Sequence, residues 1–245
     1  MKEYIFLNSL PRSGNTLLGA IVNQNSQVSV TANSILNDVI YQLQLLKNDE
    51  IYQNFPDEQS FNNIIKNVFN NYYKDWKTKV IIDRGAWGTP LNLLLLKSII
   101  TKPKFIILYR PVLECLASFI RIEKPKDIEL RCHELMDDNG MIGKNLWSIK
   151  NTISNKENYI RINYLDLVTN PVNEINKIYK FLNIDSFKHK FTNFNQFVAN
   201  KTEYNDSVLK AELHKIKTDK VEIDEIKIKN YLPLNIINQY CNLDI

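Results

Sequence analysis

The sequence predicts an α/β protein in which a parallel sheet of about five strands carries helices on both faces. Short apolar runs rich in Ile, Val, Phe and Tyr recur along the chain, and the segments between them are long enough to be crossover helices. Strands that are apolar throughout are typical of parallel sheets, because both faces of such sheets are covered. The expected strands are residues 4–7, 28–30, 80–82, 105–109 and 159–162.

The helices are indicated by apolar residues at helical spacing and by prolines at two of their beginnings. Pro90 and Pro111 lie where the first turn of a helix accepts proline. A long surface loop is expected at residues 48–60, which include Pro56. The expected helices are residues 16–23, 35–47, 61–76, 90–100, 112–122, 128–154 with a break near Gly140, and 173–182.

The chain of 245 residues is long enough to bury one large core, and we expect a single domain over residues 1–245. The regular pattern weakens after Asn183, so residues 185–245 are expected to form a less regular C-terminal cap. Within the cap, residues 209–217 and 223–240 have a mixed or helical pattern. Nothing between these parts has the composition of a flexible linker.

Composition and charge exclude several classes of protein. No apolar run approaches the roughly 20 residues of a membrane span, and the N-terminus makes a poor signal peptide, so a cytoplasmic location is expected. Three widely spaced cysteines predict neither a disulfide framework nor a zinc site. The net charge is only +4, and lysines alternate with acids in the C-terminal part, which favours a solvated surface over nucleic-acid binding.

The first candidate site is the stretch Leu10 to Leu18, which reads Leu-Pro-Arg-Ser-Gly-Asn-Thr-Leu-Leu between an expected strand and an expected helix. The first N–H groups of a helix lack internal partners, and Gly14 allows the main chain to approach a bound oxyanion. This layout predicts an anion-binding turn. The alternative interpretation is an ordinary polar connection in which Ser13 or Asn15 caps the helix.

The same turn differs from the phosphate-binding loop of ATP-dependent enzymes. That loop reads G-x-x-x-x-G-K-[ST], whereas this chain has no leading glycine, and Asn15 stands where the lysine would be. The long cation, Arg12, precedes the turn instead. The turn therefore predicts a phosphate-like ligand other than ATP.

A second candidate anion site follows the expected strand 105–109. Arg110 ends this strand and Ser118 lies on the next helix, where a guanidinium and a hydroxyl suit a second phosphate. Glu114, Ser118 and Arg121 share one stripe of that helix. Ligands of open parallel sheets bind beyond the carboxyl ends of the strands, where Arg110 and the first turn both fall. The alternative is a salt bridge at the strand end and a small residue at a helix contact.

Together these segments resemble the sulfotransferase family that uses 3′-phosphoadenosine 5′-phosphosulfate (PAPS). The shared features are P-[RK]-S-G-x-T-x-L after the first strand, and a later strand that ends in an arginine near a proline, with a serine eight residues beyond the arginine. The family has R-x-P or R-D-P at this point, whereas Arg110 and Pro111 are adjacent in this chain. Residues 160–171, Ile-Arg-Ile-Asn-Tyr-Leu-Asp-Leu-Val-Thr-Asn-Pro, are similar to the family's strand and Y-E-D-L turn. The resemblance covers residues 4–184, is closest to bacterial-type and tyrosylprotein sulfotransferases, and implies a fold like that of P-loop NTPases.

The resemblance implies how PAPS, or the product adenosine 3′,5′-bisphosphate (PAP), would be held. Arg12 would neutralise charge near the bridging oxygen, Arg110 and Ser118 would hold the 3′-phosphate, and Tyr164 would lie near the adenine. The residues expected around the 5′-phosphosulfate are Ser13, Gly14, Asn15, Thr16 and Leu17. No metal is expected, because a transferring sulfonate carries less negative charge than a phosphoryl group and protein donors can stabilise it.

The catalytic base of the family is not matched in this sequence. Small-phenol and steroid sulfotransferases have a lysine and a nearby histidine after the third core strand, whereas this chain has Asp83 and Arg84 with no histidine following. Asp83 is the candidate carboxylate, with an ion pair or a helix cap as its alternative role, and Arg84 is the candidate cation. The tyrosylprotein enzymes carry a glutamate where this chain has Asn33. His214 and His133 are further candidates.

The sequence therefore predicts an enzyme that transfers a sulfonate group from PAPS to a hydroxyl or amine of an acceptor. The acceptor is a small molecule, a carbohydrate or a peptide, and attack on sulfur is in line. Two alternatives stay open, a non-catalytic protein that only binds the nucleotide and a P-loop nucleotide kinase.

Overall fold

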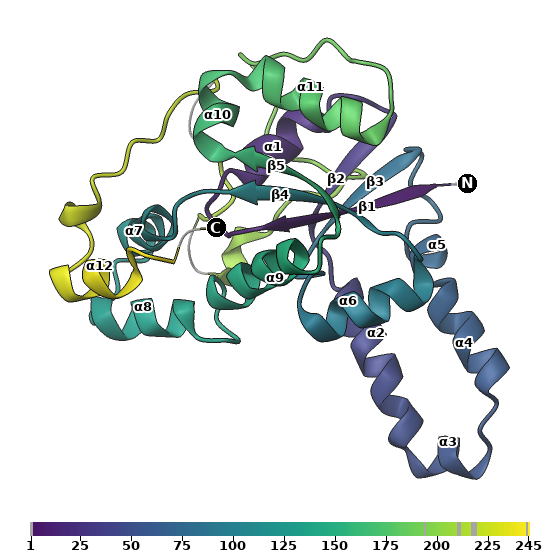
Figure 1. The fold of residues 1–245 in the computed structure, drawn as a ribbon. Helices are drawn as coiled ribbons and strands as arrows, with labels where there is room; N and C mark the ends of the chain where they lie inside the picture. Colours follow the sequence, from purple (N-terminus) through teal and green to yellow (C-terminus); the bar gives the residue numbers. More distant parts are fainter. Residues whose placement is uncertain (1, 194, 210–211, 217–219, 244) are drawn as a thin grey trace.

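The computed structural model describes residues 2–193, 195–209, 212–216, 220–243 and 245. Its centre is a sheet of five parallel strands in the order β2-β3-β1-β4-β5 (Figure 1). Each expected strand is present and extends slightly beyond its apolar run. The strands are β1 (Glu3–Ser9), β2 (Val28–Asn33), β3 (Val80–Arg84), β4 (Lys104–Tyr109) and β5 (Asn158–Asn163).

One face of the sheet is covered by α1 (Asn15–Val22), α10 (Tyr164–Thr169) and α11 (Pro171–Leu182). Side chains alternate along each strand, so Ile5 and Leu7 pack under these helices while Phe6 packs on the opposite side. The two-residue period explains why the strands read as apolar throughout, since both of their faces are buried.

The opposite face has two groups of helices (Figure 1). Phe6 and Phe105 pack against a group from the first half of the chain, α2 (Leu36–Leu45), α5 (Val68–Tyr72) and α6 (Pro90–Ile99). Ile107 and Tyr109 pack against a second group, α7 (Val112–Glu123), α8 (Ile128–Met136), α9 (Gly143–Ser154) and α12 (Leu234–Tyr240). The predicted parallel sheet with helices on both faces is thus confirmed.

The prediction of a long surface loop at residues 48–60 is wrong. The chain there forms a short 3-10 turn, η1 (Leu46–Asn48), then α3 (Glu50–Asn54) and the beginning of α4 (Glu58–Lys66), and these helices extend away from the sheet with α2 (Figure 1). Asp49 accepts a hydrogen bond from the Ile51 N–H at 2.9 Å, and Asp57 accepts one from the Ser60 N–H at 3.0 Å. These carboxylates cap helix N-termini, so the polar residues taken for a loop start helices instead.

The C-terminal part is less regular where it is described. It contains η2 (Asp206–Leu209), η3 (Ile228–Asn230) and α12, and part of the stretch 209–217 lies outside the described residues. Phe197 is buried against α1, where a Cβ added to Gly19 would lie only 2.4 Å from its ring. Leu213 is buried in the core beside α7. None of the described helices has the length and apolar character needed to cross a membrane.

Candidate active site at the carboxyl edge of the sheet

The first turn, residues 10–14, connects β1 to α1 at the carboxyl edge of the sheet. Gly14 has a φ of +92°, a value that side-chain-bearing residues rarely adopt. A Cβ at this position would also lie 2.9 Å from Cδ2 of Tyr164. Only glycine fits this conformation and this contact, so the backbone of the turn is held closely against the Tyr164 ring.

The N-terminus of α1 has no side-chain cap. The Ser13 hydroxyl donates to the Leu10 carbonyl at 2.6 Å, and the Asn15 amide donates to the same carbonyl at 2.8 Å. The first helical bond runs from the Leu18 N–H to the Gly14 carbonyl, so the N–H groups of residues 14–17 have no backbone acceptor among the described residues. The structure therefore disagrees with the interpretation of the turn as an ordinary capped connection.

Other polar groups at this turn are also without partners in the part of the chain that is described. The Ser9 hydroxyl is buried and makes no hydrogen bond, and the half-buried Thr16 hydroxyl has none either. Buried hydroxyls normally have partners. Uncapped N–H groups and free hydroxyls are the donors that an oxyanion accepts, so the residues present fit a phosphate or sulfate group.

Arg12 joins the two predicted anion sites. Its Nε lies 3.2 Å from the Ser118 hydroxyl, and its Nη1 donates to the Leu213 carbonyl. Burial is the largest cause that lowers the pKa of Arg12, and the nearby Arg110 lowers it further. Its Nη2 has no hydrogen-bond partner within the described part of the chain, and this guanidinium therefore keeps a donor for a ligand.

Arg110 lies beside Arg12 and is almost fully buried. Its Nε donates to Glu114 at 2.8 Å, its Nη1 to the Arg12 carbonyl at 3.3 Å, and its Nη2 to the Asp224 carbonyl at 2.9 Å. The guanidinium carbon lies 4.1 Å from the centre of the Tyr164 ring. This cation–π contact and the three hydrogen bonds hold Arg110 rigidly at the edge of the sheet.

The Asp224 carboxylate lies among the arginines of this edge. It accepts two hydrogen bonds from Arg121, at 2.8 and 2.5 Å, and its backbone N–H donates to the Tyr164 hydroxyl at 3.2 Å. Burial is the largest single influence on Asp224 and raises its pKa, but the hydrogen bonds from Arg121 and the positive charges of Arg121, Arg110 and Arg12 together outweigh burial, and the net pKa is lowered. The C-terminal part thus supplies three acceptors to the arginines: the Leu213 carbonyl, the Asp224 carbonyl and the Asp224 carboxylate. These acceptors take N–H groups that would also suit phosphate oxygens.

Sequence reasoning did not assign Arg121 to the site, although a signal was present. Arg121 lies three residues beyond Ser118 on the stripe that faces the ligand side, so the spacing placed it there. It was overlooked because its partner, Asp224, lies 103 residues away in a segment without a regular pattern.

The structure separates the two candidate catalytic residues of β3. Asp83 is fully buried, and its oxygens accept hydrogen bonds from the Tyr73 hydroxyl and, at 2.9 Å, from the Trp87 indole. Burial raises the pKa of Asp83 to about 6. Arg84 instead reaches the C-terminal part, where its Nη1 lies 3.3 Å from the Tyr204 hydroxyl, and burial lowers its pKa.

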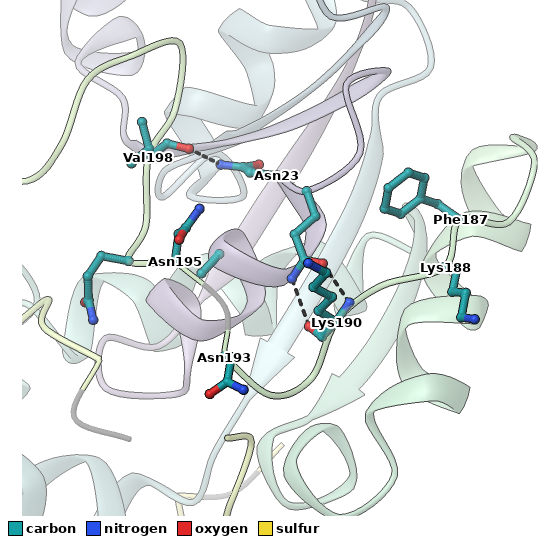
Figure 2. Close-up of a pocket in the computed structure, with 10 residues that line it drawn as sticks. Asn23, Phe187, Lys188, Lys190, Asn193, Asn195 and Val198 are labelled. Atoms are coloured by element: carbon teal, nitrogen blue, oxygen red, sulfur yellow. Dashed lines mark hydrogen bonds between the residues drawn. The ribbon is translucent and has the colours of Figure 1, made fainter. Parts of the chain in front are cut away.

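A surface pocket of about 430 Å³ lies elsewhere, at the C-terminal end of α1 (Figure 2). Asn23 and Gln24 line one side, and residues of the stretch 187–198 line the other. Figure 2 shows Asn23 bonded to the Val198 carbonyl, at 2.9 Å. None of the predicted site residues lines this pocket, because they lie at the opposite end of α1.

The parallel sheet, the uncapped helix after β1 and the arginines that follow β4 and lie on α7 define the fold class of the P-loop-like proteins. Within that class, a model of the sulfotransferase family matches residues 4–189. The chain belongs to this family. A search of curated proteins finds no match.

Solved structures with a similar fold include three sulfotransferases. The sulfotransferase domain from the curacin biosynthetic pathway is 14% identical, with coverage of 100% of this chain and 92% of that chain and a TM-score of 0.61. Mouse sulfotransferase SULT7A1 complexed with PAP is 12% identical, with coverage of 99% and 82% and a TM-score of 0.56. The sulfotransferase domain from the Synechococcus PCC 7002 olefin synthase is 19% identical, with coverage of 76% and 76% and a TM-score of 0.53. At these identities the likeness shows the fold.

Proposed function

We propose that this protein transfers a sulfonate group from PAPS to a hydroxyl or amine of an acceptor. The observation that carries the proposal is the uncapped N-terminus of α1 beside a cluster of three arginines, Arg12, Arg110 and Arg121. A nucleotide with two separate anionic groups needs two adjacent sets of donors. The family match and the PAP named for the mouse structure support the same donor.

The first turn would hold the 5′-phosphosulfate. The N–H groups of residues 14–17 and the Thr16 hydroxyl make no hydrogen bond to any described residue. They are therefore available as donors to a ligand. Arg12 would neutralise charge at the bridging oxygen with its unused Nη2. When bound, the donor supplies an activated sulfonate, and fixed N–H groups stabilise the charge that develops during transfer without reorganising.

The second set of donors would hold the 3′-phosphate. Arg110 and Arg121 lie on the two sides of Asp224, and the buried Ser118 hydroxyl contacts Arg12. Tyr164 lies between Arg110 and Gly14, so its ring would contribute to the wall beside the nucleotide. Because the charge of a transferring sulfonate is lower than that of a phosphoryl group, these protein donors suffice without a metal.

Ligand binding tests the donor site directly. We expect PAP to raise the Tm in a concentration-dependent way in buffer containing EDTA, because a ligand that binds only the folded state stabilises it, by about 2.7 kcal/mol at 100 times its Kd. ATP with Mg²⁺ serves as the comparison ligand. Stabilisation by ATP with Mg²⁺ but not by PAP would contradict the proposal and favour a nucleotide kinase.

Transfer of labelled sulfate tests the reaction. PAPS is incubated with the full chain and a panel of phenols, sugars and peptides, and labelled products are separated from the donor. Product on any acceptor class supports the proposed activity. Binding of PAP without transfer to any of them would favour a protein that holds the nucleotide and has no acceptor chemistry.

A further inference from the structure

Three residues of the C-terminal part, Tyr204, Asp206 and His214, form a cluster at the carboxyl edge of the sheet. Asp206 uses both carboxylate oxygens on His214, accepting from the backbone N–H at 2.9 Å and contacting Nδ1 at 2.5 Å. The Tyr204 ring is stacked on the imidazole, with the ring centres 3.8 Å apart and the planes within 3° of each other. The imidazole is thereby fixed in position and in rotation.

Two site arginines connect this cluster to the predicted donor site. Arg84, at the end of β3, bonds the Tyr204 hydroxyl at 3.3 Å, and Arg12 bonds the carbonyl of Leu213, the residue before His214. Both arginines act electrostatically on the imidazole. His214 therefore lies beside the turn that would hold the transferred group, on the side of β3.

The geometry leaves one nitrogen of His214 available. Because Nδ1 faces a carboxylate, it carries the proton, and Nε2 is the unprotonated nitrogen of a neutral ring. Nε2 has no hydrogen-bond partner in the described part of the chain, and 20% of the side chain is exposed. Such an arrangement of carboxylate and imidazole orients a base in other enzyme classes.

We propose that His214 is the general base that accepts the proton of the acceptor hydroxyl or amine, and that Asp206 positions it. This inference rests on the proposed sulfotransferase function. The acceptor oxygen or nitrogen forms a bond to the sulfur of the donor while the bond from sulfur to the bridging oxygen breaks. The acceptor proton passes to Nε2, and the bridging electron pair leaves with PAP. Asp206 stabilises the resulting imidazolium.

The electrostatic surroundings support a base that is neutral at physiological pH. Burial is the largest cause that lowers the pKa of His214, and Arg84 and Arg12 lower it further, while the hydrogen bond to Asp206 raises it. The net pKa lies below the usual 6.5. Tyr204 faces the ring as the stacked neighbour. A base of this kind is unprotonated over the neutral range and needs no prior loss of a proton.

The tautomer of His214 tests the inference without any acceptor. ¹⁵N NMR of histidine-labelled protein, with His214→Gln to assign the signal, should show a neutral ring protonated at Nδ1 at pH 7. Asp206→Asn should lower the pKa of His214, because the carboxylate that favours the charged ring is removed. A ring protonated at Nε2, or an imidazolium at pH 7, would overturn the proposal.

Kinetics supply the second readout, with an aliphatic alcohol and a phenol as acceptors from the panel above. We expect His214→Gln to lower kcat about 10²- to 10⁴-fold with PAP affinity unchanged within twofold, and imidazole to restore part of the rate of His214→Ala. Asp206→Asn should lower kcat at least tenfold with little change in the acceptor KM. The loss should be larger for the alcohol, whose proton is less acidic.

His133→Gln is the matched control, because the His133 ring lies against Tyr240 on α12 and its Nδ1 is hydrogen-bonded to the Tyr240 hydroxyl at 2.8 Å. Its kcat should equal that of the unmodified protein. The two ways of failing are distinguishable. Absence of PAP binding by the unmodified protein refutes the donor site, whereas transfer that persists unchanged in His214→Gln refutes only the base. Loss of PAP affinity in His214→Gln together with kcat would assign the residue to donor binding instead.

Discussion

Arg12, Arg110 and Arg121 lie close together at the carboxyl edge of the sheet, and their side chains would repel one another without anions between them. Arg110 is nearly fully buried, and both Arg110 and Arg121 act on Arg12 to lower its pKa. Burying a guanidinium costs several kcal/mol unless hydrogen bonds and an opposite charge compensate. Asp224 and Glu114 supply that compensation here. A phosphate accepts the same kind of charge-assisted hydrogen bonds from arginine, so under the proposed function we expect it to take the place of Asp224.

Arg110→Ala tests the second anion site. We expect the affinity for PAP to fall about 10- to 100-fold, because hydrogen bonds to a charged group contribute roughly 1.5–3 kcal/mol each and 1.4 kcal/mol is a tenfold change. Isothermal titration calorimetry in EDTA measures it. Arg131→Ala is the control, since Arg131 on α8 is paired with Glu123 and Glu134. Unchanged affinity in Arg110→Ala would refute the assignment of the 3′-phosphate to this residue.

Residues that follow a strand directly could be assigned to the site from the sequence. Arg12, Gly14 and Arg110 each lie within a few positions of the end of an apolar run. The end of the run is the carboxyl end of a strand, so these residues could be placed at the carboxyl edge of the sheet. The contact between Asp206 and His214 could not be predicted in this way, because neither residue follows an apolar run. The two residues lie in a segment with no apolar period, and only the folded chain shows that the segment returns to the sheet.

At the scale of elements, the described parts of a C-terminal covering segment lie against the candidate site. Its described residues are 206–209, 212–216 and 220–226, and it contacts the site through Leu213, His214 and Asp224. The contacts differ in kind. Asp224 occupies groups that the 3′-phosphate would need, whereas His214 lies beside the first turn and competes with no donor group there. We therefore expect nucleotide binding to displace the Asp224 part of the segment.

Asp224→Asn tests this displacement. The substitution removes the negative charge from Arg121 while keeping the size of the side chain, so less interaction is lost when PAP enters. We expect PAP to bind up to about fivefold more tightly, since a half-exposed ion pair contributes up to about 1 kcal/mol. Titration calorimetry at low ionic strength measures the change.

Glu222→Gln is the control for Asp224→Asn, because Glu222 lies two residues earlier and, among the described residues, forms an ion pair with Lys220 at 3.5 Å and none with an arginine of the site. It should leave the PAP affinity unchanged. Weaker binding in Asp224→Asn would show that Asp224 positions Arg121 for the nucleotide rather than competing with it.

The elements of the sheet and most helices were predictable, whereas α3 and the beginning of α4 were not. Each strand is a buried apolar run, and a run of that kind is visible in any sequence. The helix α3 has no buried residue, so no apolar period marks it. The local signals for these helices were the capping aspartates, Asp49 for α3 and Asp57 for α4.

At the scale of the whole molecule, the sheet packs a carboxylic acid inside its core. Asp83 lies in β3, where Tyr73 and Trp87 from the surrounding elements donate to it. Phe6 and Phe69 pack beside Trp87 in the same cluster. An ionised carboxylate in such surroundings destabilises the fold, because desolvation disfavours its charge more than two donors favour it.

The free energy of unfolding should therefore fall as the pH rises from about 4 to about 6. The pKa of Asp83 is raised from 3.8 to about 6 in the folded chain, so the stabilising contribution is complete below pH 3.8 and is lost as the pH passes the folded value. A difference of about two between the folded and unfolded pKa of Asp83 corresponds to about 3 kcal/mol.

Urea unfolding of Asp83→Asn and of the unmodified chain at pH 4 and pH 7 isolates this contribution. Relative to the unmodified chain, Asp83→Asn should gain about 3 kcal/mol between the two pH values, while the exposed Asp75→Asn should gain nothing. An equal difference at both pH values would show that Asp83 ionises in the folded chain with its ordinary pKa.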